Sequence, residues 1–321
     1  MAERGAVATG LRDWLRARGL DASVAVSDRA TVGLSQETWF IRVDTGTGER
    51  EAVLRLPTLA SGPQAILTQR AALEAVADVV PAPALLWYDD TSANPFECPF
   101  LVMERIRGQV PVGWRELDEP VRTEIAQEAV DVLASLHRTD PGAIASARGR
   151  SAERPSDLDW YRQRVERFAP IPAVLQGALW WLERRRPSPP EHQVLTHGDY
   201  RMGNMVIEGG HLQGVLDWEM ASVGDPLADL AWCFIPVWEP SLVTESELVE
   251  RYAERVCAPV DDERLHWHRV LGYVRLCYYA LSGLHAFDRG RSNDFRLAAL
   301  RLQLPVHLDR LAATLAGEPI T

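Results

Sequence analysis

One segment constrains the fold of this chain more than any other, residues 195–232, which read LTHGDYRMGNMVIEGGHLQGVLDWEMASVGDPLADLAW. Two short apolar runs flank Glu208, Gly209 and Gly210, a pattern that predicts a tight β-hairpin. Because a tight hairpin returns its second strand beside its first, we expect Asp217 to lie close to Asn204. Asp199 sits on the loop before the hairpin. The segment therefore predicts that two carboxylates and one amide converge.

This set of side chains fits the requirements of phosphoryl transfer. One carboxylate orients the attacking hydroxyl and accepts its proton, while a second carboxylate and an amide oxygen hold Mg²⁺ against the phosphates. The spacing H-x-D-x-x-x-x-N, followed by a returning strand that ends in Asp, is the catalytic-loop and metal-aspartate signature of kinases. We therefore assign Asp199 as the catalytic base, and Asn204 and Asp217 as magnesium ligands.

Other interpretations of this segment are weaker. Asp199 and Asp217 taken alone would be turn or cap residues, but the order of all three residues around the hairpin argues against that. A phosphohydrolase metal site built on His197 needs further histidines near strand ends, and those of this chain are scattered. For Glu219 and Asp229, a contact with the metal shell or with Arg201 and a purely structural role both stay open.

The rest of the chain changes character near residue 105. Residues 1–105 predict a short amphipathic helix, three antiparallel strands, one helix and two further strands, which together form a small sheet lobe. Residues 106–321 are mostly helical, apart from the hairpin segment. We expect an α+β fold of two lobes, a small antiparallel-sheet lobe at 1–105 and a larger helical lobe at 106–321. A cleft between lobes is a usual place for a small-molecule site.

Composition narrows the functional class. The 321 residues carry a net charge of −11, which argues against a nucleic-acid partner because such partners need a basic face. The four cysteines are too far apart for a zinc site. The N-terminus lacks the apolar core of a signal peptide, and no apolar run is long enough to cross a membrane. These features predict a cytoplasmic protein with a small-molecule partner, and they leave the oligomeric state open.

The motifs HGDYRMGN and LDWEMASVGDPLADLAW resemble those of the aminoglycoside phosphotransferase family, and in particular its branch associated with acyl-CoA dehydrogenases. Choline and homoserine kinases are more distantly similar. The resemblance implies a protein-kinase-like fold of two lobes, in which DWE stands where protein kinases have D-F-G. It implies ATP and Mg²⁺ as cofactors and transfer of the γ-phosphate to a small-molecule hydroxyl. It also implies that His197 is structural and bonds the loop backbone.

The same resemblance places nucleotide-binding residues in the small lobe. The stretch TVGLSQETW is similar to the family's nucleotide-covering loop, with Gly33, Ser35 and Gln36 facing phosphate, although an ordinary hairpin turn would look alike. Arg55, in AVLR, replaces the lysine that binds the α- and β-phosphates, and a guanidinium can do this work with a different geometry. Its partner on the following helix is either Gln69 or, in a shifted register, Glu74.

The stretch FLVMERIRG is similar to the inter-lobe hinge of the family. Met103, Glu104 and Arg105 would then present backbone groups to adenine. An edge strand leaving the sheet would need the same residues, and only the order of elements favours the hinge.

Two functional hypotheses follow. The first is a kinase acting on an aminoglycoside or on a hydroxylated metabolite such as a hydroxyacyl compound. The second is a nucleotide-binding pseudokinase with a regulatory or scaffold role, which Arg55 and Gln69 motivate. Acidic residues beyond the hairpin would suit a cationic acceptor, and aromatic residues would suit an apolar one, although a solvated helix face and core packing account for the same residues. The residues concerned are Glu239, Glu245, Glu247, Glu250, Trp160, Tyr161, Trp180 and Trp181.

Overall fold

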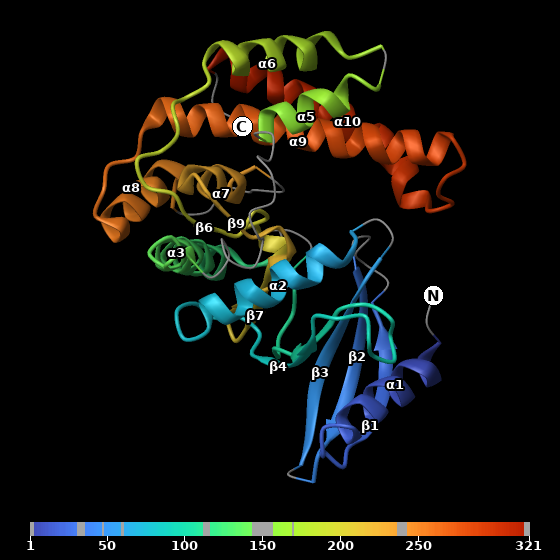
Figure 1. Cartoon of the computed structure of the whole chain (residues 1–321). Coiled ribbons are helices and arrows are strands. Elements are labelled where there is room, and N and C mark those ends of the chain that lie inside the picture. The colour runs from blue at the N-terminus through green and yellow to red at the C-terminus, as the bar shows by residue number, and fades with distance from the viewer. Residues whose placement is uncertain are drawn as a thin grey trace.

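The N-terminal part of the chain is a five-stranded antiparallel sheet with one helix on each face (Figure 1). The computed structural model describes residues 3–30, 36–46, 48–58, 61–111, 116–142, 157–168, 170–235 and 243–317. The strand order is β1-β2-β3-β5-β4. The elements are α1 (Arg4–Arg16), β1 (Ser23–Arg29), β2 (Gln36–Asp44), β3 (Glu49–Pro57), α2 (Pro63–Val76), β4 (Leu85–Asp89) and β5 (Phe100–Glu104).

Side-chain alternation along the central strands builds the two faces of this sheet. In β3, Leu54 packs with α1 in one apolar cluster, whereas its neighbour Val53 packs with α2 in another. In β5, Val102 likewise packs with α1 and Met103 with α2. Successive residues of a strand point to opposite faces, so Arg55, one position beyond Leu54, lies on the face that α2 covers. The sequence pattern predicted this sheet and its helices correctly.

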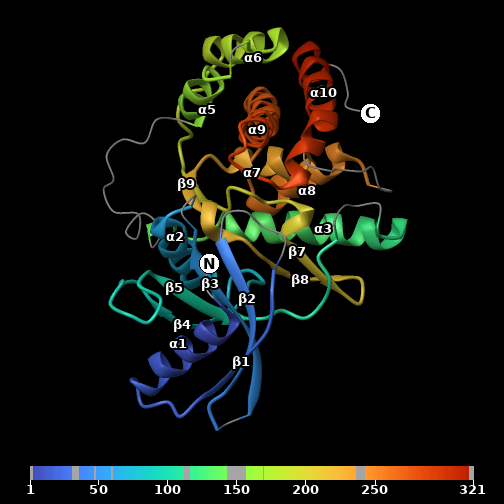
Figure 2. The same ribbon diagram turned by 90° about the vertical axis from the view of Figure 1, so that its right-hand side faces the viewer.

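The remainder of the described chain is mostly helical and is organised around α9. Figure 2 shows α9 end-on, with α5 and α6 on one side, α10 on the other and α7 below, and all four contact it. A third apolar cluster fills the space between these helices. The helices are α3 (Glu119–Leu136), α5 (Asp157–Val165), α6 (Ala173–Arg184), α7 (Pro226–Cys233), α8 (Glu245–Val256), α9 (Asp262–Asp288) and α10 (Phe295–Ala316).

Two small antiparallel sheets lie between the main sheet and these helices. β6 (Val194–Thr196) pairs with β9 (Ser222–Gly224), and β7 (Met205–Glu208) pairs with β8 (His211–Val215). Gly209 and Gly210 form the turn between β7 and β8, with φ of 61° and 84°. These angles lie in the left-handed region that glycine tolerates best. The predicted hairpin is therefore confirmed.

The sequence also predicts two helix caps, one at Asp225 followed by Pro226 and one at Thr244 with Glu247, and both are present. The Asp225 side chain accepts a hydrogen bond from the backbone N–H of Leu227 at the start of α7. Thr244 and Glu247 form a reciprocal capping box at the start of α8. α10 continues through Pro305.

The predicted division at residue 105 falls one residue after β5 ends at Glu104. The largest apolar cluster nevertheless crosses it, since Leu101 and Met103 of the sheet share that cluster with Ile125 and Trp218 of the helical part. The two parts are thus joined by a common core.

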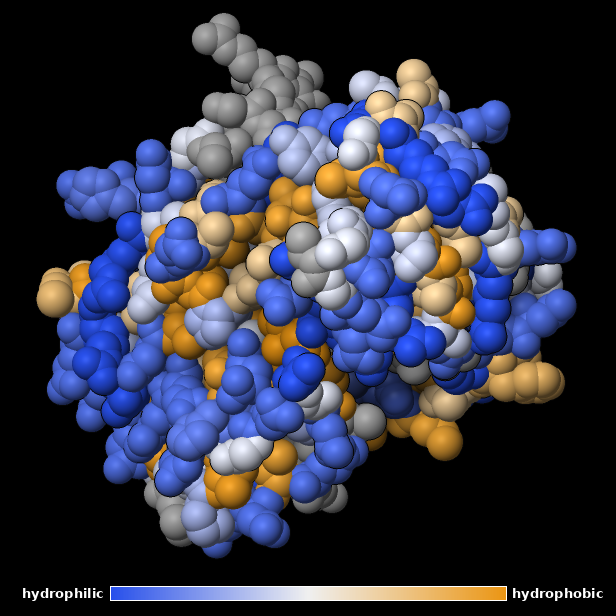
Figure 3. All heavy atoms as spheres, turned by 90° about the horizontal axis from the view of Figure 1, so that it is seen from below, coloured by the Kyte–Doolittle hydropathy of each residue, from blue (hydrophilic) through white to orange (hydrophobic). Residues whose placement is uncertain are grey.

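Seen from below Figure 1, the surface is largely hydrophilic, with apolar patches separated by polar side chains (Figure 3). Within the part of the chain that the structure describes, no helix combines the length and the apolar character needed to cross a bilayer.

Candidate active site

The loop that carries Asp199 is anchored by a buried carboxylate of α7. The backbone N–H of His197 donates to Asp229 Oδ2 at 2.6 Å, and that of Gly198 donates to Oδ1 at 2.9 Å. Asp229 is 1% exposed, and its Oδ2 also lies 3.5 Å from His137 Nε2. Burial raises the pKa of Asp229, but His137, His197 and their hydrogen bonds together lower it by more. The pKa of Asp229 therefore lies below its ordinary value. Asp229 therefore has the structural role that the sequence left open.

His197 connects this loop to the end of the hairpin. The backbone N–H of Asp199 donates to His197 Nδ1 at 3.1 Å, so the proton of the neutral ring lies on Nε2, which donates to the Leu216 carbonyl at 2.8 Å. Burial lowers the pKa of His197. A neutral, hydrogen-bonded imidazole is a structural link, as the sequence predicted.

Two backbone conformations shape the site. Gly198 has φ of 79°, and a Cβ there would lie 2.6 Å from the Met220 carbonyl oxygen, so no larger residue fits. Asp217 has φ of 65° and ψ of 53°, which is left-handed although it carries a side chain. Such a conformation costs about 1 kcal/mol and recurs at functional sites. It turns the chain sharply at the end of the hairpin.

Both carboxylate oxygens of Asp199 are fully engaged. Oδ1 accepts from Trp232 Nε1 at 2.7 Å and from Arg275 Nη2 at 3.2 Å. Oδ2 accepts from Asn204 Nδ2 at 2.8 Å and from Arg201 Nε at 3.2 Å. Burial raises the pKa of Asp199, but the charges of Arg275 and Arg201 outweigh it, and the pKa lies below its ordinary value. The carboxylate is therefore ionised at neutral pH.

The hairpin brings the three predicted residues together as expected from its geometry. Asn204 Nδ2 donates to both the Asp199 carboxylate and the Asp199 carbonyl, each at 2.8 Å. The backbone N–H of Leu216 donates to the Asn204 carbonyl at 2.7 Å, which sets Asp217 one residue beyond this contact. Within the described residues, the Asn204 side chain makes two hydrogen bonds, both donated by its nitrogen, so its oxygen is left to accept.

The Asn204 side-chain oxygen and the Asp217 carboxylate are suitable ligands for a magnesium ion. An amide oxygen and a carboxylate are hard oxygen ligands, and Mg²⁺ at kinase sites takes the rest of its ligands from phosphates and water. No group of three or more His, Cys, Asp or Glu side chains suited to a metal occurs in the described ranges. The described residues thus do not form a metal site from protein ligands alone, whereas a metal shared with a nucleotide would need only the two ligands assigned.

Arg55 reaches across from the sheet to Asp217, with which it forms an ion pair. It is 8% exposed. Neither of the partners left open by the sequence holds it: Glu74 is bound by Arg70 at 2.6 Å, and the Gln69 side-chain oxygen accepts no hydrogen bond from the described residues. The sequence missed this pair because the two residues are 162 positions apart.

The other predicted nucleotide residues have mixed outcomes. Gly33 and Ser35 lie outside the described residues. Gln36 is 5% exposed, and neither its side-chain oxygen nor its nitrogen has a hydrogen-bond partner in the described structure.

The backbone of the predicted hinge already makes hydrogen bonds within the protein. The backbone N–H of Glu104 donates to the Ala84 carbonyl at 2.8 Å, and that of Arg105 donates to the Glu51 carbonyl at 3.2 Å. β5 lies between β3 and β4, so this stretch is not an edge strand, and its two N–H groups are already used inside the protein. Met103, next to them, is buried and packs beneath α2. Binding of adenine by this stretch stays a prediction.

Four of the residues considered for acceptor binding have structural contacts. Glu245 pairs with Arg269, and Glu247 belongs to the capping box of α8. Trp160 and Tyr161 pack edge to face with each other, with ring centroids 4.8 Å apart, in the apolar cluster around α9. Glu239 lies outside the described residues.

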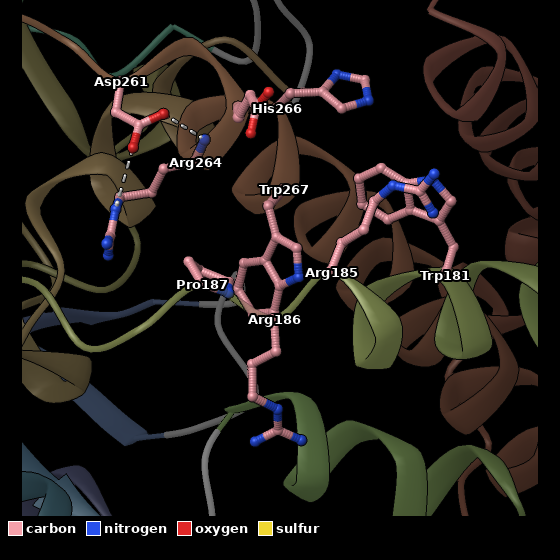
Figure 4. A pocket seen from close by; sticks show the side chains of 9 residues that line it. Trp181, Arg185, Arg186, Pro187, Asp261, Arg264, His266 and Trp267 are labelled. Carbon is pink, nitrogen blue, oxygen red and sulfur yellow. Dashed lines mark hydrogen bonds and ion pairs between the residues drawn. The ribbon is translucent and has the colours of Figure 1, made fainter.

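A separate cavity of about 460 Å³ lies between the end of α6 and the start of α9 (Figure 4). Trp181, Arg185, Arg264 and Trp267 are among its lining residues. Arg275 lies eight residues beyond Trp267 on α9, about 12 Å along the helix axis. The cavity is therefore distinct from the Asp199 site.

Comparison with known proteins places this geometry in context. A family model described as "Phosphotransferase enzyme family" matches residues 29–273. Acyl-CoA dehydrogenase family member 10 of Mus musculus is 30% identical over 224 residues, 65% of this chain and 20% of that protein. Family member 11 of Gallus gallus is 33% identical over 161 residues, 48% of this chain and 20% of that protein. The chain thus spans about a fifth of the length of these relatives.

A homoserine kinase of Pseudomonas aeruginosa (strain LESB58) is 34% identical over 124 residues, 33% of this chain and 36% of that protein. Among solved structures, a GDP complex of aminoglycoside 2'-phosphotransferase-IIIa has a TM-score of 0.67 at 16% identity and covers 96% of this chain and 99% of its own. A ternary complex of aminoglycoside phosphotransferase APH(4)-Ia with ADP and hygromycin B has a TM-score of 0.64 at 19% identity and covers 98% and 100%. These structures confirm the kinase-like fold.

Proposed function

The chain belongs to the phosphotransferase enzyme family, and from this premise we propose that it is an ATP- and Mg²⁺-dependent kinase that transfers the γ-phosphate to a hydroxyl group of a small molecule. One observation carries the proposal: Asp199 is a partly buried, ionised carboxylate in contact with Asn204, while Asp217 returns beside them. In phosphoryl transfer such a carboxylate orients the attacking hydroxyl and takes up its proton.

The roles of the other residues follow from their positions. Asn204 and Asp217 would hold Mg²⁺, which when bound neutralises charge on the phosphates. Arg55 would bind phosphate oxygens with its guanidinium, so binding of the nucleotide replaces its ion pair with Asp217 and frees that carboxylate. The Gln36 amide, which has no partner among the described residues, is available to donate to the nucleotide.

A nucleotide as the phosphate donor is supported by the structural neighbours, which include complexes with ADP and with GDP. The first of these also holds hygromycin B, and one relative is a homoserine kinase. Small molecules with hydroxyl groups are therefore the acceptors that the similar proteins suggest.

Two acceptor classes remain, an aminoglycoside and a hydroxylated metabolite such as a hydroxyacyl compound. The charge beside the base favours the second, because Arg201 and Arg275 both lie 3.2 Å from the Asp199 carboxylate and would repel a polycation. The relatives named for acyl-CoA dehydrogenases also have the higher sequence identity. A screen of ATP consumption with neutral, anionic and polycationic alcohols tests this preference, and turnover limited to the polycations would contradict it.

The pseudokinase alternative is tested by Mg²⁺-dependent ATP hydrolysis without any acceptor. We expect slow hydrolysis by the parent enzyme and its loss in Asp217→Ala. The matched control is Glu208→Ala, which removes an exposed carboxylate from the same hairpin and should leave the rate unchanged. Nucleotide binding without hydrolysis in the parent enzyme would favour the pseudokinase.

A further inference from the structure

Arg275 of α9 holds both the candidate base and the peptide group that precedes it. Its Nη1 donates to the Gly198 carbonyl at 2.7 Å, and its Nη2 donates to Asp199 Oδ1 at 3.2 Å. Its Nε donates to the Tyr279 hydroxyl at 3.1 Å, and its guanidinium lies 3.8 Å over the Trp232 ring. With 13% of its side chain exposed, Arg275 is fixed from several directions.

We propose that Arg275 is a positioning residue of the phosphotransferase, which together with Trp232 holds Oδ1 of Asp199 so that Oδ2 is the oxygen presented to the acceptor hydroxyl. This inference rests on the proposed role of Asp199 as the base. It adds which of its two oxygens reacts and which residue outside the catalytic loop determines that choice.

The lone pairs of the Asp199 carboxylate limit how many donors it can bind. Two oxygens offer about four acceptor positions, and four donors already occupy them, two on each oxygen. An acceptor hydroxyl therefore has to displace one donor before it can hydrogen-bond to Asp199.

The donors on Oδ1 are the harder ones to displace. Trp232 is 5% exposed, makes a hydrogen bond of 2.7 Å and is stacked beneath Arg275. Arg275 in turn keeps its contacts with Gly198 and Tyr279 if the Asp199 contact is strained. Moving either donor would break several contacts at once.

On Oδ2, Arg201 is the donor that leaves most easily. Its hydrogen bond of 3.2 Å is longer than the 2.8 Å bond from Asn204, and 34% of its side chain is exposed. Asn204 stays because its nitrogen is also tied to the Asp199 carbonyl. The acceptor hydroxyl thus takes the position of Arg201 on Oδ2.

The test compares Arg275→Ala and Arg275→Lys with Arg269→Ala, which removes another ion-paired arginine of the same helix. The probe is Mg-ATP with water as the acceptor. We expect kcat of Arg275→Ala to fall roughly 10- to 100-fold, because misplacing a catalytic group by about 1 Å has effects of this size, with KM for ATP unchanged. Arg275→Lys keeps the positive charge but loses the two-pronged donor geometry of the guanidinium. Its kcat should therefore lie between that of Arg275→Ala and that of the parent enzyme. Added guanidinium should restore activity to Arg275→Ala alone.

The outcomes separate this inference from the proposed function. If Arg275→Ala turns over like the parent enzyme while Asp199→Ala is inactive, the positioning role is wrong and the kinase remains. If the parent enzyme itself shows no Mg²⁺-dependent turnover, the proposed function fails.

Two further measurements hold even if Arg275→Ala does not fold. Trp232→Phe keeps a ring beneath Arg275 but loses the N–H to Oδ1, so its kcat should fall, and a kcat equal to that of the parent enzyme overturns the proposal. A crystal structure of the parent enzyme with Mg²⁺ and AMP-PNP should keep Arg275 on Oδ1. Arg275 found away from Oδ1 there would overturn it independently of any activity.

Discussion

The polar groups assigned to the reaction, on the helical side of the candidate site, and the glutamines assigned to the nucleotide, on the sheet side, differ in how they are satisfied. On the helical side, Asp199 accepts four hydrogen bonds, Asp229 accepts two from backbone N–H groups, and both ring nitrogens of His197 are paired. On the sheet side, the Gln36 amide and the Gln69 side-chain oxygen have no partner in the described structure. The groups that carry the chemistry are pre-arranged, whereas these two glutamines, which were predicted to meet the nucleotide, are not.

This difference has an energetic meaning. An unpaired buried polar group costs about 1–3 kcal/mol, so a ligand that pairs with it recovers that free energy. A pre-arranged carboxylate instead avoids reorganisation at the moment of reaction. We infer that the helical side contributes mainly to turnover and the sheet side mainly to nucleotide affinity. Substitutions on the two sides should then change different kinetic constants.

The largest expected effect is on turnover at the helical side. Asp199→Ala should lower kcat by roughly 10²- to 10⁴-fold, the usual effect of losing a positioned base. Binding of ATP, measured at equilibrium with a fluorescent nucleotide, should persist. Asp309→Ala, which removes an exposed carboxylate of α10, serves as the control. Turnover of Asp199→Ala at the parent rate would remove the basis for the comparison.

Asp229→Asn should show that the same side is also held together by its polar contacts. The amide offers one acceptor oxygen where the carboxylate offers two, so an N–H of His197 or Gly198 loses its partner in a buried place. We expect a loss of about 3 kcal/mol in the free energy of unfolding, measured in urea. Asp261→Asn, at the exposed start of α9, should cost less than about 1 kcal/mol. A loss of that small size in Asp229→Asn would contradict the anchoring role.

Whether a contact could be predicted from the sequence depended on how far apart its residues lie along the chain. The hairpin, the caps at Asp225 and Thr244 and the approach of Asp199 to Asn204 depend on residues close in sequence, so local patterns were sufficient. The contacts of Arg275 with Asp199 join residues 76 positions apart. Nothing in the local sequence distinguishes Arg275 from the other arginines of α9, because its role depends on how that helix packs.

The sheet side was predicted with less success for a related reason. The strands follow from alternation, but the partner of Arg55 depends on how the sheet sits over the hairpin, and it is Asp217 rather than Gln69 or Glu74. The bilobal, kinase-like fold itself was predicted from the family resemblance and is confirmed by the similar structures.

Acid should weaken the support beneath the catalytic loop. Burial raises the pKa of Asp225, but His268, Arg264 and the Leu227 N–H lower it to about 2. Because its folded-state pKa lies below the ordinary 3.8, Asp225 stabilises the protein above about pH 4, and this contribution is lost as the pH falls toward 2. After allowance for solvent screening the loss is about 1–2 kcal/mol. Urea unfolding at pH 5 and pH 3 measures it, and Asp225→Asn should flatten that dependence.

On the sheet side the expected effect moves to nucleotide affinity. Arg55→Gln removes a charge proposed to bind phosphate, so KM for ATP should rise about tenfold, the size of one charge-assisted contact, with a smaller change in kcat. Arg70→Gln is the matched control, because Arg70 lies on the same part of the chain but pairs with Glu74 and Asp90. A fall in kcat without a rise in KM would mean that Arg55 contributes to turnover and not to nucleotide affinity.

The smallest expected effect is that of Gln69→Leu, and it is also the most direct test of the comparison. Gln69 is fully buried, and among the described residues its nitrogen contacts only Met103 Sδ, at 3.8 Å, while its oxygen has no partner. Exchanging such a group for an apolar one of similar size removes a desolvation penalty along with little bonding. The free energy of unfolding should therefore change by less than about 1 kcal/mol in either direction, whereas Asp229→Asn, also a near-isosteric change of a buried polar residue, costs about 3 kcal/mol.

Leu73→Ala on the same helix, expected to cost about 2–4 kcal/mol, shows that the unfolding assay detects damage to α2. If Gln69→Leu instead raises KM for ATP while stability is unchanged, the unpaired oxygen belongs to the nucleotide site, and the contrast between the two sides becomes sharper. A loss of stability as large as that of Leu73→Ala would mean that Gln69 has a partner that its contacts do not reveal. The division into a satisfied and an unsatisfied side would then be wrong.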